Sequence, residues 1–245
     1  MKETLDSLSI GNLQLLQAES GYRYSLDPIL LARFVKIKKG ARVVDLGTGA
    51  GILPLLLARL SDAAELVGIE LQSELAARAG RNVELNFLQG RVRILREDVR
   101  NIRDIYPVSC VDLVVSNPPY RQPDSGRIAP NDERAIARHE LSGGLADFVA
   151  AASWLLKNGG CFSVIYLAER LPELMTRMVT AGIEPKRLRM IHSRQSEAAK
   201  MVLLEGRKGG RPGLVVEKPL YLYKDSVLGR DYTEEVLRMY EDSPG

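Results

Sequence analysis

The stretch VVDLGTGAGILPL, residues 43–55, decides the fold, because it joins a short apolar run to an apolar helix through a glycine-rich turn. The run at 41–47 is typical of a buried strand, and 52–60 is typical of the helix that follows it. Glycine at every second position of the turn lets the backbone bend sharply and lets a ligand lie against it, close to helix N–H groups. The spacing is G-x-G-x-G, and Ile52 stands where the dinucleotide-binding fingerprint needs its third glycine. We therefore expect a ligand site here but do not favour a pyrophosphate.

Short apolar runs and amphipathic segments keep alternating after this unit. Strands are expected at 65–70, 92–98, 111–117 and 161–167, and helices at 73–87, 148–157 and 169–182. Alternation at this spacing is typical of an α/β fold, with a parallel sheet and helices on both of its faces. The runs at 185–193 and 199–208 are joined by a loop that is too short for a parallel crossover, so we expect the last pair to be antiparallel.

We expect one domain over residues 1–245, with a short N-terminal extension (1–26) and a basic C-terminal segment (186–223). Two irregular stretches, 121–144 and 206–219, are long enough to be functional or mobile loops. Residues 186–211 hold eight basic and two acidic side chains, whereas the rest of the chain holds 26 basic and 29 acidic ones. The net charge of +3 thus hides a cationic segment of +6, which suits a polyanionic partner; ordinary solvated surface is the alternative.

The overall composition excludes several classes of protein. A hydrophobic fraction of 45% and a charged fraction of 27% are globular values, which exclude disorder as the main state. Cys110 and Cys161 lie in or beside apolar runs, so we expect buried thiols in a reducing compartment. Neither cysteine nor histidine occurs at metal-ligand spacing, and no metal is expected. The chain has no signal-peptide pattern and no apolar run that could cross a bilayer, so we expect a cytoplasmic protein without a membrane partner.

Two acidic residues stand at the ends of the next two expected strands. Glu70 ends one of them, 19 residues after Gly51, and Asp98 ends the other. A carboxylate at Glu70 can accept hydrogen bonds from both hydroxyls of a ribose, and Asp98 can accept one from an adenine amino group, beside the Val99 N–H. Each acid alone is most often solvated surface. Together with Asp45 they lie at the carboxyl ends of successive strands, where open α/β sheets bind ligands, and so predict a site for an adenosine without phosphates.

The tetrapeptide Asn117-Pro118-Pro119-Tyr120 follows the fourth expected strand, and its two prolines stiffen the backbone. A simple strand-terminating turn is the alternative. The chemistry suits a planar amino group, which is a poor nucleophile because its lone pair is delocalised into the ring. The Asn117 side-chain oxygen and the Pro118 carbonyl can each accept one N–H, which aims the lone pair at a methyl donor in line. Tyr120 can stack on the base, a contribution of ~1–3 kcal/mol.

These residues taken together resemble the S-adenosylmethionine-dependent methyltransferases of the Rossmann-like class, class I. The resemblance implies a seven-stranded, mostly parallel sheet with an antiparallel last strand. It also implies that Asp45, Gly47 and Gly49 line the methionine part of the cofactor, and that the segment at 24–27 closes over it. The residues expected to bind S-adenosyl-L-methionine are Asp27, Asp45, Gly47, Thr48, Gly49, Glu70, Leu71, Asp98, Val99 and Asn117.

The tetrapeptide resembles that of methyltransferases acting on adenine N6 or on protein glutamine amides. The stretch RIAPNDERAIARHE (127–140) and the segment 191–223 resemble a narrower group, bacterial enzymes that methylate N6 of adenine 37 in the anticodon loop of a valine tRNA. We therefore expect a tRNA adenine-N6 methyltransferase with Asn117, Pro118, Pro119 and Tyr120 as its catalytic residues. The residues expected to bind RNA are Arg134, Arg138, Arg187, Arg189, Arg194, Lys200, Arg207 and Lys208. The alternatives are a protein glutamine N5-methyltransferase, an RNA guanine-N2 methyltransferase, and an RNA-binding module with a vestigial cofactor site.

Overall fold

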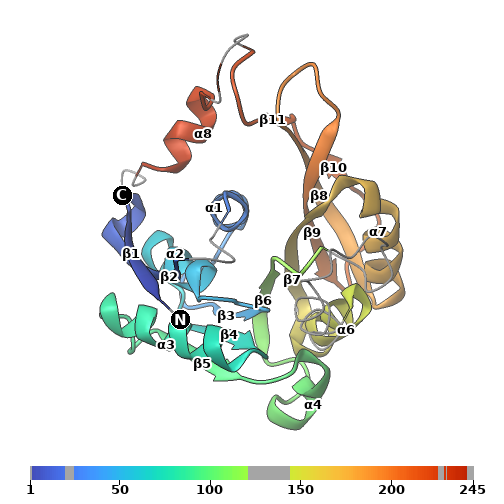
Figure 1. Cartoon of the computed structure of the whole chain (residues 1–245). Coiled ribbons are helices and arrows are strands. Elements are labelled where there is room, and N and C mark those ends of the chain that lie inside the picture. Colours follow the sequence, from blue (N-terminus) through green and yellow to red (C-terminus); the bar gives the residue numbers. More distant parts are fainter. Residues whose placement is uncertain (1, 20–24, 121–143, 226–228, 230, 242–245) are drawn as a thin grey trace, which may run out of the picture.

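The computed structural model describes residues 2–19, 25–120, 144–225, 229 and 231–241. Its centre is a nine-stranded sheet with the strand order β10-β8-β9-β7-β6-β3-β4-β5, in which β11 also pairs with β8 (Figure 1). The strands of this sheet are β3 (Arg42–Leu46), β4 (Glu65–Glu70), β5 (Val92–Arg96), β6 (Val111–Ser116), β7 (Leu156–Leu167), β8 (Ile183–His192), β9 (Ala199–Lys208), β10 (Val215–Val216) and β11 (Leu220–Tyr221).

The direction of the strands confirms the expected class I sheet. Strands β3 to β7 are parallel to their neighbours among themselves, and β9 is antiparallel to both β7 and β8. The sequence pattern does not predict β10 and β11, two-residue strands that run parallel to β8 and extend this edge. Strand β3 lies between β4 and β6, so the strand order reverses there: β4 and β5 are added on one side of β3, and β6 and β7 on the other. In open α/β sheets ligands bind at such a reversal, so a ligand site is expected at the carboxyl ends of β3, β4 and β6.

Helices cover both faces of the sheet, as the alternating pattern predicts (Figure 1). One face carries α1 (Asp27–Phe34), α2 (Ile52–Leu60) and α3 (Ser73–Leu85); the other carries α4 (Ile102–Ile105), α6 (Leu145–Leu155) and α7 (Leu171–Thr180). Successive strand residues serve the two cores in turn, since Val43 packs in the first and Val44 in the second. Both residues are buried, which explains why the central strands are almost wholly apolar.

Most expected boundaries lie within about three residues of the observed ones, and the largest difference is at the start of β7. The helix expected at 148–157 is α6, which ends at Leu155, and β7 already begins at Leu156 rather than at 161. The sequence Asn158-Gly159-Gly160 therefore belongs to the strand and does not stop the helix. Gly159 has a φ of +80° and lies where the register between β6 and β7 shifts, so its conformational freedom serves a bulge.

The N-terminal extension is a folded hairpin. Strands β1 (Glu3–Leu8) and β2 (Leu13–Ala18) pair antiparallel on either side of the short 3-10 helix η1 (Ile10–Asn12). Leu13 and Leu15 are fully buried, and a Glu3 Oε1 accepts a hydrogen bond from Arg78 Nε of α3 at 2.8 Å. The hairpin, dark blue in Figure 1, is thus docked on the helical layer of the domain.

The C-terminal segment returns to the same side of the molecule. After β11 the chain forms α8 (Glu234–Met239), and the Met239 carbonyl accepts a hydrogen bond from Arg33 Nε of α1 at 3.0 Å. The Tyr240 carbonyl accepts another from Ser9 Oγ of the hairpin region at 2.9 Å. This segment therefore links the β11 edge of the sheet to the N-terminal hairpin, as Figure 1 shows.

Both cysteines are free thiols, and each is half-buried rather than fully buried as expected. Burial raises the pKa of both thiols. Within the described ranges, no three His, Cys, Asp or Glu side chains gather as metal ligands would. The helices of those ranges are all too short or too polar to cross a membrane.

Candidate active site

The glycine turn after β3 is hydrogen-bonded to β4 and is uncovered at Gly49. Gly47, Gly49 and Gly51 all have positive φ angles of 72°, 58° and 82°, which a side chain would strain. The Gly47 and Thr48 N–H groups donate to the Ile69 carbonyl of β4 at 2.9 and 3.0 Å. A Cβ at Gly47 would lie 3.0 Å from the Phe148 ring, whereas one at Gly49 would meet nothing within 4 Å. A ligand can therefore approach the backbone at Gly49.

Glu70 binds this turn from the end of β4. Its Oε2 accepts the Gly49 N–H at 2.9 Å, and its Oε1 accepts the Gln72 N–H at 2.8 Å. The residue is 6% exposed, and burial raises the pKa of its carboxyl. Each carboxylate oxygen has a further lone pair, so Glu70 can still accept hydrogen bonds from two ribose hydroxyls.

Asp45 lies at the same edge, between Gly68 of β4 and Val115 of β6. It is 3% exposed, and burial raises the pKa of its carboxyl to about 8, an effect that the nearby Glu70 charge increases. Thr48 lies close enough to oppose this pKa shift, but not in hydrogen-bonding geometry: among the described residues, neither Asp45 Oδ1 nor Thr48 Oγ1 has a hydrogen-bond partner. Two buried polar atoms without partners at a ligand edge are groups that a bound molecule can satisfy.

Asp98 follows β5 and caps the short helix η2 (Val99–Asn101) by accepting the Arg100 N–H at 2.9 Å. Arg100 Nε also contacts both carboxylate oxygens, at 3.0 and 2.9 Å. This guanidinium holds the pKa of Asp98 below its usual range. Arg100 was not among the expected site residues, since an arginine two positions past a strand end has no distinctive pattern. It keeps Asp98 ionised and ready to accept a hydrogen bond.

The tetrapeptide Asn117–Tyr120 lies at the carboxyl end of β6, whose last residue Ser116 donates its hydroxyl to the Leu46 carbonyl of β3 at 2.8 Å. The Tyr120 hydroxyl is 2.5 Å from Asn117 Oδ1 and 3.0 Å from Asp27 Oδ2 at the start of α1. A hydroxyl has one proton, so Asn117 Oδ1 and Asp27 Oδ2 are alternative acceptors for it. The contact joins the expected catalytic loop to the segment expected to close over the cofactor.

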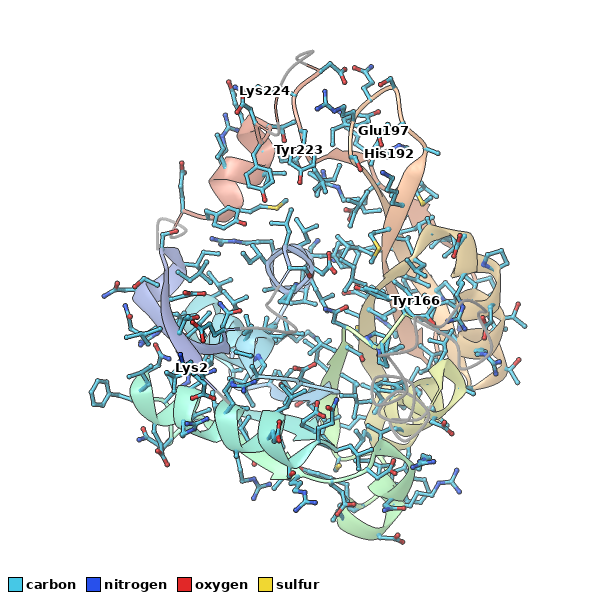
Figure 2. All side chains as sticks on the ribbon, in the orientation of Figure 1. Lys2, Tyr166, His192, Glu197, Tyr223 and Lys224 are labelled. Atoms are coloured by element: carbon cyan, nitrogen blue, oxygen red, sulfur yellow. The ribbon has the colours of Figure 1, made fainter. Side chains whose placement is uncertain are left out.

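Two residues that the sequence does not mark support Tyr120. Its ring packs edge-on against Tyr166 of β7, with centroids 5.8 Å apart and planes at 64°; Tyr166 is labelled in Figure 2. Arg170 of the short helix η3 (Ala168–Arg170) donates to the Tyr120 carbonyl at 3.4 Å and lies 5.0 Å above the Tyr166 ring. Glu173 pairs with this guanidinium at 2.7 Å. Tyr120 is therefore fixed at its ring, its hydroxyl and its backbone.

The residues expected to bind RNA do not form one patch. Lys200 lies near the turn between β8 and β9, where Figure 2 shows His192 and Glu197. The next residue, Met201, pairs with Leu167 at the carboxyl end of β7. Arg207 pairs with Cys161 and lies six residues after Met201 along β9, a separation of about 20 Å at 3.3 Å per residue. Arg194 and Lys200 thus lie toward the end of the sheet that carries Asn117–Tyr120, and Arg207 and Lys208 lie toward the opposite end.

Several of these cations have partners within the chain. Arg187 donates to the Phe34 carbonyl at 2.7 Å and to Glu217 at 2.9 Å. Lys208 Nζ donates to the Leu156 carbonyl at 2.9 Å. Lys200 pairs with Glu197 at 3.0 Å, although 67% of its side chain is exposed. Arg189 pairs with Glu235, and Arg194 donates to the Gly229 carbonyl. Arg134 and Arg138 lie outside the described residues, and RNA binding by all eight stays a prediction.

Comparison with known proteins places this site in a family. The model of the methyltransferase small domain matches residues 27–181. A tRNA1(Val) (adenine(37)-N6)-methyltransferase of Dyadobacter fermentans is 24% identical over 226 residues, 91% of this chain and 92% of that protein. A protein of the same name from Yersinia pseudotuberculosis is 34% identical over 141 residues, 57% of this chain and 54% of that protein.

Among solved structures, a predicted O-methyltransferase of Agrobacterium tumefaciens has a TM-score of 0.71 at 24% identity, and the match covers 88% of this chain and 97% of that one. This likeness confirms the class I methyltransferase fold. The family match begins at Asp27, includes the glycine turn, Glu70 and Asp98, and extends beyond Tyr120. The site described above therefore lies within the matched region, and the chain belongs to the methyltransferase small domain family.

Proposed function

We propose that this protein transfers the methyl group of S-adenosyl-L-methionine to N6 of an adenine in tRNA, adenine 37 of a valine tRNA. The observation that carries this function is the position of Asn117 and Tyr120 at the end of β6, joined through the Tyr120 hydroxyl to Asp27. The full-length relative from Dyadobacter fermentans, whose name states this reaction, supports the choice of substrate.

The residues at the sheet edge fit this cofactor. Asp45 Oδ1 and Thr48 Oγ1 are buried without partners among the described residues, beside the open face of Gly49, and suit the polar methionine part. Glu70 and Leu71 would hold the ribose, and Asp98 and Val99 the adenine, with Asp27, Gly47 and Asn117 completing the site. When bound, the cofactor supplies an electrophilic methyl group.

The catalytic loop orients the acceptor. Asn117 Oδ1 and the Pro118 carbonyl accept the two N–H groups of the adenine amine, and Pro119 keeps the backbone stiff between them and Tyr120. In the structure Asn117 Oδ1 accepts the Tyr120 hydroxyl. Because Asp27 is a second acceptor for that hydroxyl, the phenol proton can turn to Asp27 when the substrate amine arrives at Asn117. Tyr120 then stacks on the base without occupying the oxygen that the amine needs.

The RNA approaches at the carboxyl end of the strands, where Arg194 and Lys200 lie. Its target base is unstacked, as base-modifying enzymes require, since the amine must reach Asn117 and Pro118 at the end of β6. Arg207 and Lys208, about 20 Å away along the strands, would contact a different part of the tRNA.

The test is methyl transfer from labelled S-adenosylmethionine to unmodified valine tRNA, with the products identified by mass spectrometry of nucleosides. We expect N6-methyladenosine with the unchanged protein and none with Asn117→Ala, which should still bind the cofactor. Label in N2-methylguanosine would establish the guanine alternative, and label in protein would establish the glutamine alternative. Unchanged activity of Asn117→Ala would overturn the proposed role of the amide.

A further inference from the structure

Helix α3 and the residue that caps its C-terminus, Asn86, present two asparagines, four residues apart, to the N-terminal hairpin. Asn86 Oδ1 accepts the Gln14 N–H at 2.9 Å, and its Nδ2 donates to the Gln14 carbonyl at 2.7 Å. Asn82 repeats the arrangement two residues along β2: it accepts the Leu16 N–H at 2.7 Å and donates to the Leu16 carbonyl at 3.2 Å. The two amides thus replace a neighbouring strand along the second edge of β2.

Of the two amides, Asn82 also reaches the glycine turn. Its Nδ2 donates to the Ala50 carbonyl at 3.0 Å, whereas Asn86 Nδ2 donates to the Asn82 carbonyl within the same helix at 2.7 Å. Asn82 is fully buried, with 0% exposure. On the same helix face, Ala79 lies 3.0 Å from the position of a Cβ on Gly51. Helix α3 therefore contacts two successive residues of the turn, Ala50 and Gly51.

The turn is held by two side chains from different elements. Glu70 accepts the Gly49 N–H, and Asn82 donates to the Ala50 carbonyl. The second contact fixes the plane of the peptide that joins Ala50 to Gly51, just before the backbone takes a φ of +82° and enters α2. Without Asn82, that carbonyl would lose its side-chain donor, and the peptide could rotate more freely.

We propose that Asn82 is a positioning residue for the cofactor, which holds the glycine turn in its binding shape and couples that shape to the docked hairpin. When β2 is in place, Leu16 fixes both ends of the Asn82 amide and aims its second N–H at Ala50. Loss of the Leu16 contacts would free the amide and weaken its hold on the turn. The inference rests on the proposed function only for the identity of the ligand.

Asn82→Ala and Asn86→Ala form a matched pair for the test. Each variant removes two hydrogen bonds to β2 and one other: Asn82→Ala removes the bond to the Ala50 carbonyl of the glycine turn, and Asn86→Ala removes the bond to the Asn82 carbonyl of α3. The dissociation constant of S-adenosylmethionine is measured by calorimetry without RNA, together with the melting temperature. We expect similar losses of melting temperature, with cofactor affinity about three- to thirtyfold weaker in Asn82→Ala and changed by less than about twofold in Asn86→Ala.

The ionised carboxylate of Asn82→Asp keeps an acceptor for the Leu16 N–H but has no proton to donate to Ala50, so at a pH above its carboxyl pKa this variant should lose cofactor affinity as Asn82→Ala does. It keeps the test valid if the alanine variant fails to fold. Hydrogen exchange over residues 47–55 should rise in the Asn82 variants and stay unchanged in Asn86→Ala.

Equal cofactor affinity in Asn82→Ala and Asn86→Ala, or full affinity in Asn82→Asp, would overturn the inference and leave the proposed function intact. An unchanged protein that does not bind S-adenosylmethionine at all would overturn the proposed function, and this inference with it.

Discussion

Replacing Asp45 by asparagine should make the cofactor-free protein more stable, by an amount that grows with pH. Burial raises the pKa of the Asp45 carboxyl from its ordinary value of 3.8 to about 8. Between these two values the folded protein holds a proton that the unfolded chain has released. The stabilisation by Asp45 is therefore complete below the lower value and is lost as the pH rises through the higher one. Asparagine keeps the shape of the side chain and removes its titration.

The size of the effect follows from proton linkage. One proton held only by the folded state changes the free energy of unfolding by ~1.4 kcal/mol per pH unit. From about pH 5 to about pH 7.5, the advantage of asparagine over aspartate should thus grow by at most about 3 kcal/mol. Relaxation around the ionised carboxylate lowers this figure, so we expect a gain of about 1–3 kcal/mol.

Urea denaturation of the two proteins over this pH range, without cofactor, measures the difference directly. Asp104→Asn removes an exposed carboxylate from α4 and is the control for the loss of one charge. The reasoning fails if the stability difference between Asp45→Asn and the unchanged protein stays constant with pH, or if the variant is less stable at about pH 7.5. The same variant should bind S-adenosylmethionine more weakly, because the carboxylate that costs stability is offered to the ligand.

Three further predictions concern the catalytic loop and the RNA. Tyr120→Phe keeps the ring but removes the hydroxyl bonded to Asn117, so kcat should fall about three- to tenfold. Tyr120→Ala should also raise KM for tRNA because stacking contributes ~1–3 kcal/mol, and steady-state kinetics in which the two variants match would contradict a stacking role. Arg170→Met should slow methyl transfer while calorimetry shows cofactor affinity within about twofold of normal; a large loss of cofactor affinity would place Arg170 in the cofactor site instead. In gel-shift titrations Lys200→Glu should weaken tRNA binding more than Arg207→Glu, and the reverse order would place the RNA at the other end of the strands.

The acidic residues of the site could be predicted from sequence because each stands at or just beyond the carboxyl end of a strand. Parallel strands bring their carboxyl ends to one edge whatever lies between them, so Asp45, Glu70 and Asp98 meet as a consequence of topology. The contact between Asp27 and Tyr120 spans 93 residues, and neither residue has a local pattern that specifies the other. Tyr166 lies near the end of an apolar strand, as many core aromatic residues do, so its place against Tyr120 appears only in the fold.

The N-terminal hairpin shows a second limit of local patterns. Its strand β2 is short, and its pairing partners along one edge are side chains rather than a strand. Polar residues in an amphipathic helix are normally assigned to solvent, yet Asn82 is fully buried because its amide hydrogen-bonds the backbone of another element. Buried amides of this kind follow from tertiary pairing, which periodicity does not encode.

The net charge counted over the C-terminal segment does not describe the charge that the folded protein presents there. The excess of +6 over residues 186–211 omits carboxylates that stand later in the chain. Arg187 pairs with Glu217 and lies 4.2 Å above the Phe34 ring, and Arg189 pairs with Glu235. Strand direction then divides the remaining cations between the two ends of the sheet. Arg194 and Lys200 lie toward the end of the sheet that carries Asn117–Tyr120, whereas Arg207 and Lys208 lie toward the other end. We therefore expect selection of the target base to depend mainly on the shape and hydrogen bonding of the Asn117–Tyr120 loop, with phosphate attraction as a weaker, less selective contribution.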